Sequence, residues 1–381
     1  MRHSKKGCGL LGMLATLASL WSQTAGADYA LNMTRGVTEL SREIYDLHML
    51  IFWICCAIAA LVFGVMFWSI FKFRKSKGAV AAQFHHSAKA EYIWTIIPIF
   101  ILVGMAIPAT KSLVKMESTG DADITVKITG YQWKWHYEYV NTGFGFFSVL
   151  ASDSNEARGL RSGKNPAAVD NYLREVDRPL VLPVGKKVRF LMTGNDVIHA
   201  WWVPALGWKR DAIPGYINES WTRIDEPGIY RGQCAELCGK DHAFMPIVVK
   251  AVSEDEYHAW VKAALVAQAD ASAGADREWS KDELLAKGAK VYGTFCVACH
   301  QSNGQGMPPA FPALAGSAIA TGPVEQHMNR VMNGNPGTAM AAFSAQLNDV
   351  DLAAVITYER NSFGNTKGDV VQPAAIKAAR K

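Results

Sequence analysis

The sequence has little excess charge and no cysteine to spare. Its formal net charge is +5 over 381 residues, and part of that charge lies in two short basic runs, residues 2–6 and 72–77, which flank apolar segments. Such a weak surplus disfavours nucleic-acid binding, which needs a basic face or stripe. Of the seven cysteines, one lies near the N-terminus, two lie in an apolar run and four form two close pairs. This distribution leaves no disulfide framework and points to metal or haem attachment.

Residues 1–27 have the pattern of a signal peptide. They open with a basic stretch, continue through an apolar stretch from Gly9 to Trp21, and end at Ala25-Gly26-Ala27. We therefore expect cleavage after Ala27 and a mature chain that begins outside the cytoplasm.

Two apolar runs, at about 47–71 and 93–113, are each long enough to cross a bilayer. The basic residues of 72–77 follow the first run directly, and basic loops favour the cytoplasmic side. The sequence thus predicts a transmembrane helical hairpin within residues 28–118, with both outer ends on the extracytoplasmic side. The alternative, two buried core helices of a soluble protein, is disfavoured because both runs are long and uniformly apolar.

The remainder of the chain divides into a β-rich part and a helical part. Between Ile124 and about Val252, short runs of β-forming residues alternate with Gly, Pro and Asn-Asp turns, which predicts an all-β sandwich or barrel. Within it, residues 142–176 look like a long inserted loop. A helix from Glu254 to about Val266 closes this domain, 119–266, and the small residues of 267–280 form a linker. A helical domain, 281–381, follows.

A cluster of soft metal ligands lies near the end of the β-rich part. Cys234, Cys238, His242 and Met245 follow one another at fixed spacing, and His199 lies at an earlier boundary of strand and loop. Thiolates, imidazoles and a thioether suit copper, and two thiolates four positions apart can bridge a pair of copper ions. The competing reading is a Cys2His2 zinc site, but zinc has no use for the thioether.

Cys296, Cys299 and His300 form a Cys-x-x-Cys-His motif for covalent c-type haem attachment, with the histidine as an iron ligand. We expect a helix before this motif and a closing helix from about Asn348 to Asn361, each with residues at helical spacing along one face. The first face contains Leu285, Gly288, Ala289 and Tyr292, and the second contains Leu352, Val355, Ile356 and Glu359. Met307 is too close to His300 to reach the opposite side of the haem, and Met328 and Met332 can be core residues of a helix.

From residue 40 to about 260 the chain resembles subunit II of haem-copper cytochrome c oxidase, through the two apolar runs, YQWKWHYEY, DVIHAWWVPALG and the Cys234–Met245 motif. The resemblance implies a cupredoxin-like domain with a binuclear copper centre, CuA. It also implies a set of residue roles. CuA would be bound by the Glu236 carbonyl and by the side chains of His199, Cys234, Cys238, His242 and Met245. The Glu236 carboxylate would reach a magnesium ion shared with subunit I. Electrons would enter at Trp133, and Glu91 would mark the entrance of a proton-uptake pathway.

Residues 281–366 resemble a class I cytochrome c, and Met340 occupies the position of that family's second axial ligand. The fusion resembles subunit II of caa-type oxidases, with a small all-α cytochrome c domain. The resemblance implies electron transfer from haem c through CuA to haem a and the oxygen-reducing site in subunit I, for which this chain has no candidate residues.

The implied setting is a bacterial-type cell membrane, with both cofactor domains outside the cytoplasm. The implied partners are subunits I and III, membrane lipid and cytochrome c or another electron donor, with no nucleic acid. A freestanding membrane electron carrier stays open as an alternative. A nitrous oxide reductase is disfavoured by the membrane helices, and a quinol oxidase subunit is disfavoured by the copper ligands. His48, His85, His86, His136, His258 and His327 are expected to be ordinary surface or interface residues.

Overall fold

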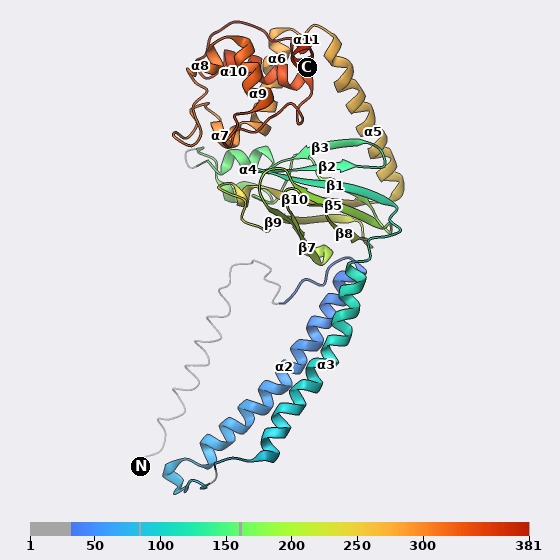
Figure 1. Cartoon of the computed structure of the whole chain (residues 1–381), viewed down its shortest axis with the longest axis vertical. Helices are drawn as coiled ribbons and strands as arrows, with labels where there is room; N and C mark the ends of the chain where they lie inside the picture. The colour runs from blue at the N-terminus through green and yellow to red at the C-terminus, as the bar shows by residue number, and fades with distance from the viewer. Residues whose placement is uncertain (1–31, 84, 160–161, 381) are drawn as a thin grey trace, which may run out of the picture. The chain divides into compact units, whose positions relative to one another are not determined.

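The computed structural model describes residues 32–83, 85–159 and 162–380, apart from the side chains of 271–273 (Figure 1). The predicted signal peptide lies outside these residues. The chain divides into two units: one comprises Tyr45–Ala82 with the residues up to Arg35, and the other comprises Gly36–Ile44 and Gln83–Lys381. Each unit is described by itself.

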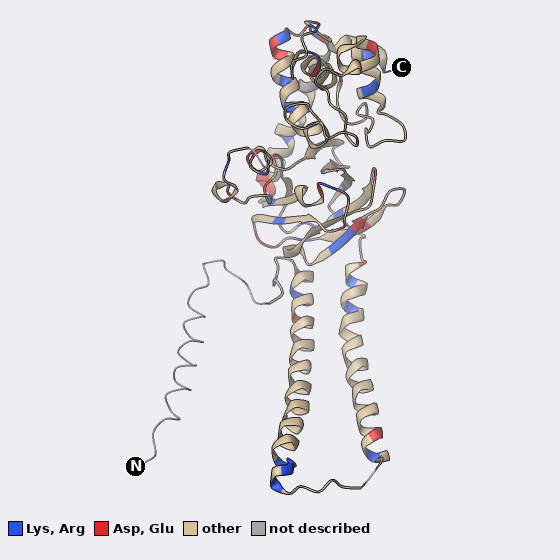
Figure 2. Ribbon diagram, turned by 90° about the vertical axis from the view of Figure 1, so that its left-hand side faces the viewer, with Lys and Arg blue, Asp and Glu red and all other residues tan. Residues whose placement is uncertain are grey.

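Two long apolar helices follow one another in the chain. They are α2 (Glu39–Lys72) and α3 (Ala88–Met116), with the 3-10 turn η1 (Lys75–Lys77) between them. Both extend beyond the apolar runs at 47–71 and 93–113, and both are long and apolar enough to cross a membrane. Their large side chains are mostly exposed, and Figure 2 shows α2 without charged residues along most of its length and with basic residues at its C-terminal end. An apolar surface of this kind needs lipid or protein to cover it.

The β-rich part is a sandwich of two five-stranded sheets. One sheet has the strand order β3-β2-β1-β5-β8 and the other β4-β10-β9-β6-β7. The strands are β1 (Ile124–Tyr131), β2 (Lys134–Tyr139), β3 (Phe144–Ser148), β4 (Leu180–Pro183), β5 (Val188–Gly194), β6 (His199–Val203), β7 (Trp208–Ala212), β8 (Asn218–Thr222), β9 (Gly228–Cys234) and β10 (Pro246–Val252). Neighbours pair antiparallel, except β1 with β5 and β4 with β10.

One apolar core joins the two sheets. Side chains of β5 alternate between buried and partly exposed along the whole strand, as expected for a sheet with one buried face. Trp135 and Tyr137 from the first sheet and Trp201 and Val249 from the second are completely buried in this core. The core therefore supplies a rigid base under the loops at the edge of the sandwich.

The segment at 142–176 contains more regular structure than its composition predicted. It includes β3, whose Phe144 and Phe146 are buried in the core, the short helix α4 (Ser152–Ala157) and the 3-10 turn η2 (Pro166–Ala168). The aromatic residues of β3 decide its structure, because they fill the core beside Tyr139. Only the part after β3 is an insertion.

The helix after β10 is also longer than expected. α5 (Glu254–Ala273) continues past Val266 into the first half of the predicted linker, 267–280, and the 3-10 turn η5 (Gly274–Asp276) follows it. Alanine is common in 267–275, and its high helix propensity favours this extension.

The C-terminal part is a bundle of short helices. It contains α6 (Lys281–Phe295), α7 (Val297–His300), α8 (Ala318–Thr321), α9 (Val324–Asn333), α10 (Asp349–Asn361) and α11 (Pro373–Ala379). A capping box of Ser280 and Glu283 starts α6. The buried face of α6 contains Leu284, Gly288, Val291 and Tyr292. The prediction was therefore right for Gly288 and Tyr292 and wrong for Leu285 and Ala289, whose places on the buried face are taken by Leu284 and Val291. The predicted face of α10 is buried throughout.

Candidate copper and haem sites

Two buried thiols lie at the centre of a group of soft donor atoms. The Sγ atoms of Cys234 and Cys238 are 3.8 Å apart. Cys234 Sγ lies 3.9 Å from Nδ1 of His199 and 3.4 Å from the carbonyl oxygen of Glu236. His199, Cys234 and Cys238 are all buried and form the one group of three or more potential metal ligands found among the described residues.

The second thiol has its own pair of donor atoms. Cys238 Sγ lies 3.5 Å from Nδ1 of His242 and 3.5 Å from Sδ of Met245. The thioether of Met245 is 1% exposed, so it faces the thiols and not solvent. Four donors therefore surround two thiol sulfurs and not one central point. This arrangement fits a pair of thiolate-bridged copper ions better than a single tetrahedral zinc.

The sheet positions these donors. His199 begins β6 and Cys234 ends the neighbouring strand β9, while the 3-10 turn η4 (His242–Phe244) leads back to β10. The backbone N–H of Cys234 donates to the carbonyl of Met245 at 3.3 Å, which closes the loop between them. Gly130 of β1 makes room for the histidine, because a Cβ there would lie 2.7 Å from the His199 ring.

The two thiols influence each other's protonation. A hydrogen bond from Cys238 lowers the pKa of Cys234 to about 3, and the same contact raises the pKa of Cys238. The opposite directions of the two shifts have one cause: a thiolate beside a thiol is favoured over two neighbouring negative charges, which repel each other. Thiolate is the form that binds metal.

Asp196 orients the first histidine. Its Oδ1 lies 2.9 Å from Nε2 of His199, and its Oδ2 accepts from the backbone N–H of Gln132 at 2.7 Å. Burial raises the pKa of Asp196, but hydrogen bonds from His199 and nearby backbone N–H groups outweigh it, so the net shift is downward. With Nε2 engaged, Nδ1 of His199 is left to bind a metal, as is usual for histidine ligands held by a carboxylate.

Trp133 contacts the same loop from the turn between β1 and β2. Its indole Nε1–H donates to the carbonyl of Cys238 at 3.1 Å, and the side chain of Gln132 donates to the same oxygen at 2.9 Å. The indole is therefore one hydrogen bond away from the backbone of a candidate copper ligand.

Lys240 connects this loop with the haem motif. Its ammonium donates to the carbonyl of Ala298, which lies between the two motif cysteines. The Nζ atom also lies 4.7 Å from the ring centroid of Phe311 and 5.6 Å from that of Trp133. Lys240 thus contacts residues of both candidate sites.

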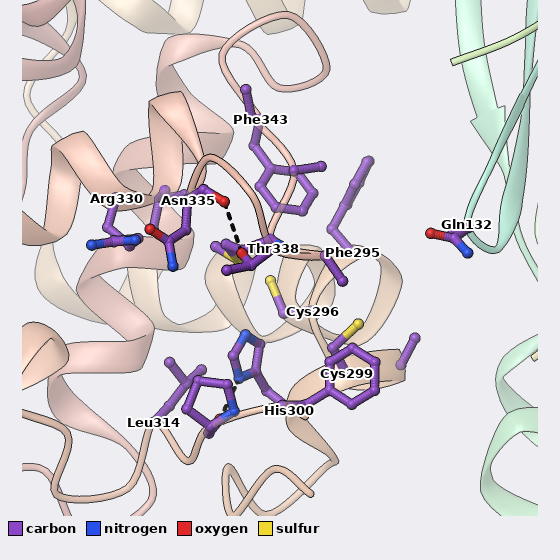
Figure 3. A pocket seen from close by; sticks show the side chains of 18 of the residues that line it. Gln132, Phe295, Cys296, Cys299, His300, Leu314, Arg330, Asn335, Thr338 and Phe343 are labelled. Carbon is purple, nitrogen blue, oxygen red and sulfur yellow. Dashed lines mark hydrogen bonds between the residues drawn. The ribbon is translucent and has the colours of Figure 1, made fainter. Parts of the chain in front are cut away.

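A cavity of about 770 Å³ contains the Cys-x-x-Cys-His motif. Its walls include Cys296, Cys299 and His300 (Figure 3). Met340 also lines the cavity. His300 Nδ1 lies 2.8 Å from the carbonyl of Pro312, which fixes the ring and leaves Nε2 for iron. In Figure 3, Asn335 and Thr338, which precede Met340 on its loop, lie across the pocket from His300. The volume and these donors fit a covalently attached haem.

Met340 is the methionine that lines this cavity within the described part of the chain. Met328 and Met332 are buried in the core of the helical domain instead, and Met307 forms an isolated bridge with Phe311. This geometry supports Met340 over the other three as the second axial ligand.

Comparison with known proteins identifies the parts of the chain. Residues 124–252 match the family described as cytochrome C oxidase subunit II, periplasmic domain, and residues 26–111 match its transmembrane domain. Residues 283–358 match cytochrome C oxidase, cbb3-type, subunit III.

Curated relatives cover these parts together. The chain is 41% identical over 225 residues to the probable cytochrome c oxidase subunit 2 of Rickettsia prowazekii, covering 59% of this chain and 69% of that protein. It is 30% identical over 336 residues to cytochrome c oxidase subunit 2 of Alkalihalophilus pseudofirmus, covering 84% of this chain and 86% of the other. The chain belongs to the cytochrome c oxidase subunit 2 family.

A solved structure matches part of the chain. The crystal structure of the periplasmic domain of subunit II of cytochrome oxidase from Bradyrhizobium japonicum is 44% identical, covers 38% of this chain and 96% of its own, and gives a TM-score of 0.33. The family assignment, with a C-terminal cytochrome domain, agrees with a caa-type fusion. The predicted fold class, two apolar helices, a β-sandwich and a helical cytochrome domain, is confirmed.

The individual site roles in this oxidase subunit stay predictions, but the structure places every residue concerned. The side chain of Glu236 is exposed while its carbonyl faces Cys234. Glu91 lies in the first turn of α3, where its carboxylate accepts from the backbone N–H of Ser87 at 3.3 Å.

The sequence pattern missed four residues around these sites. His327 was expected at a surface or interface, yet it is 1% exposed and its Nε2 lies 2.8 Å from Oε2 of Glu359 in the wall of the haem cavity. Asp196 lies only three residues before its partner His199, but no motif marks the pair. Lys240 has no spacing signal, because its partner Ala298 lies far away in the sequence. Arg158 lies in the segment 142–176, whose composition predicts a loop and gives no sign of its bond to Asp241 in the copper loop.

Proposed function

We propose that this chain carries CuA and one haem c as subunit II of a proton-pumping terminal cytochrome c oxidase. It would accept electrons through haem c and pass them through CuA to haem a and the oxygen-reducing site of subunit I. The main support is the position of Trp133, whose indole binds the Cys238 carbonyl and whose ring lies beside Lys240, a residue that also contacts the haem motif.

Each residue has a defined task in this proposal. When bound, the copper pair and the haem would each accept and release single electrons. Cys234 and Cys238 would bridge the coppers, with His199, His242, Met245 and the Glu236 carbonyl completing the set. A buried, thiolate-rich site held by a rigid sheet changes its geometry little when its charge changes.

The remaining assignments concern the partner subunits and the membrane. We place α2 and α3 across the membrane, with residues 73–87 in the cytoplasm and the sandwich and haem domain outside it. Subunits I and III would cover the exposed apolar surfaces of these helices. The exposed carboxylate of Glu236 would bind a magnesium ion shared with subunit I, and Glu91 would lie at the mouth of a proton-uptake pathway. The external donor would be cytochrome c or another electron carrier.

Metal and haem analysis tests the proposal. The purified full chain should hold two copper ions and one covalently bound haem c, and zinc in place of copper would contradict the CuA assignment. The complex purified from native membranes should also contain a haem-a-bearing subunit. If no such subunit copurifies, the chain is a freestanding membrane electron carrier.

A further inference from the structure

The insertion between β3 and β4 is firmly attached to the sandwich. The backbone N–H of Ala151 donates to the carbonyl of Glu175 at 3.0 Å, and the N–H of Leu173 donates to the Ser154 hydroxyl at 3.1 Å. Ser154 and Ala157 of α4 are buried. Glu175 forms an ion pair of 2.6 Å with Arg231 of β9. The end of α4 therefore has a fixed base from which a side chain can support a neighbouring loop.

Arg158 extends from the end of α4 to the copper loop. Its guanidinium donates to Oδ2 of Asp241 at 3.1 Å, and its central carbon lies 4.2 Å from the ring centroid of Phe244. A second hydrogen bond, of 2.8 Å to Asn155, holds the guanidinium from its own helix. The side chains of Arg158 and Asp241 are only 18% and 11% exposed, so water screens this charge pair weakly.

The two contacted residues flank candidate copper ligands. Asp241 directly precedes His242, and Phe244 directly precedes Met245. Among the described residues, no side chain caps the turn η4, and Gly239 just before it has a left-handed backbone, with φ of 117°. The planar guanidinium binds the carboxylate along its edge and the ring on its face, two contacts that a lysine ammonium does not combine in this way.

We propose that Arg158 is a positioning residue for the copper centre. It holds the turn of residues 241–245 in the ligand geometry before metal arrives, so that His242 and Met245 need little rearrangement to bind. Arg158 orders residues 241–245 whether or not metal is bound. Its influence on copper binding rests on the function proposed above.

Hydrogen exchange on the copper-stripped full chain tests the first part. In Arg158→Gln, the backbone amides of residues 241–245 should exchange at least about tenfold faster than in the wild type. The reason is that local opening of the loop no longer has to break a charged hydrogen bond. Asp241→Asn should have the same effect, and Arg158→Lys should be intermediate. Arg174→Gln is the matched control, an exposed arginine of the same insertion for which the described structure records no side-chain bond. Exchange in Arg158→Gln within twofold of the wild type would overturn the proposal.

The copper-loaded chain provides a second, spectroscopic measurement. Arg158→Gln should lose copper to a chelator faster than the wild type and Arg174→Gln, and its copper hyperfine pattern should change because His242 and Met245 are less fixed. An unchanged pattern together with an unchanged rate of copper loss would contradict the role of Arg158. A wild-type chain that takes up no copper would instead refute the CuA assignment, and the exchange result would still decide whether Arg158 orders the loop.

Discussion

The position of one sulfur atom decides which methionine can bind the haem iron. Met340 lines the cavity and Met332 is buried in the core of the same domain. We predict that Met340→Leu keeps the haem attached at Cys296 and Cys299 but loses the far-red absorption band of the sulfur-iron bond. The haem potential should also fall, because a methionine ligand raises it.

Met332→Leu is the matched control for this change. Leucine and methionine have similar volumes, so the substitution should be tolerated in the core, and the far-red band should persist. Retention of the band in Met340→Leu, or its loss in Met332→Leu, would move the ligand to another position.

A single carboxylate at the start of α3 gives a second test. Glu91 lies in the first turn, where a negative charge is favoured by the helix dipole. If it is part of a proton-uptake pathway, Glu91→Gln should slow oxygen-reduction turnover and proton uptake of the complete oxidase and leave the copper and haem c spectra unchanged. Normal turnover in the variant would show that Glu91 is an ordinary residue at the membrane interface.

The packing of two helices shapes the haem domain. Gly288 of α6 lies against α10 so closely that an added Cβ would be 2.2 Å from the carbonyl oxygen of Ala354 and 2.6 Å from Cβ of Tyr358. We predict that Gly288→Ala lowers the free energy of unfolding of this domain by about 1–3 kcal/mol, the usual cost of overpacking. Denaturant titration of the full chain, followed by haem absorbance, measures this change.

Gly293, in the same helix, is the matched control. A Cβ there meets no atom within 4 Å, so Gly293→Ala should raise the unfolding free energy by about 0.5–1 kcal/mol through helix propensity alone. Two identical substitutions in one helix should thus have opposite signs. A loss of stability in both would show that helix packing at Gly288 is not the cause.

Local patterns predicted most elements, and contacts between distant elements account for the differences. The apolar runs and the β-rich segments needed only composition and periodicity, and the donor side chains between Cys234 and Met245 needed only fixed spacing. By contrast, β3 depends on core contacts of Phe144 and Phe146 that loop composition concealed. Asp241 lies 83 residues from its partner Arg158, and Glu359 lies 32 residues from its partner His327. No local sequence signal could pair residues so far apart.

At the level of the larger unit, aromatic and basic side chains join the sandwich to the haem domain. Phe147 of β3 and Phe295 of α6 have ring centroids 5.2 Å apart, and the ammonium of Lys134 lies 4.5 Å from the Phe295 ring. Burial lowers the pKa of Lys134 to about 8, and the surrounding rings partly compensate for lost hydration. Lys240 adds its bond to Ala298 beside these contacts.

The Lys240 contact predicts a rate effect without a change in either cofactor site. Lys240→Gln removes the charged donor to the Ala298 carbonyl and the cation beside Trp133 and Phe311. Electron transfer from haem c to CuA should therefore slow several-fold in flash-photolysis traces, because the two loops are no longer held together, while the copper and haem spectra stay those of the wild type. Lys262→Gln, an exposed lysine of α5 with no ion pair in the described chain, should transfer electrons at the wild-type rate. Equal rates of electron transfer in Lys240→Gln and Lys262→Gln would show that Lys240 does not hold the copper loop and the haem motif together. Trp133 would then receive electrons through another contact.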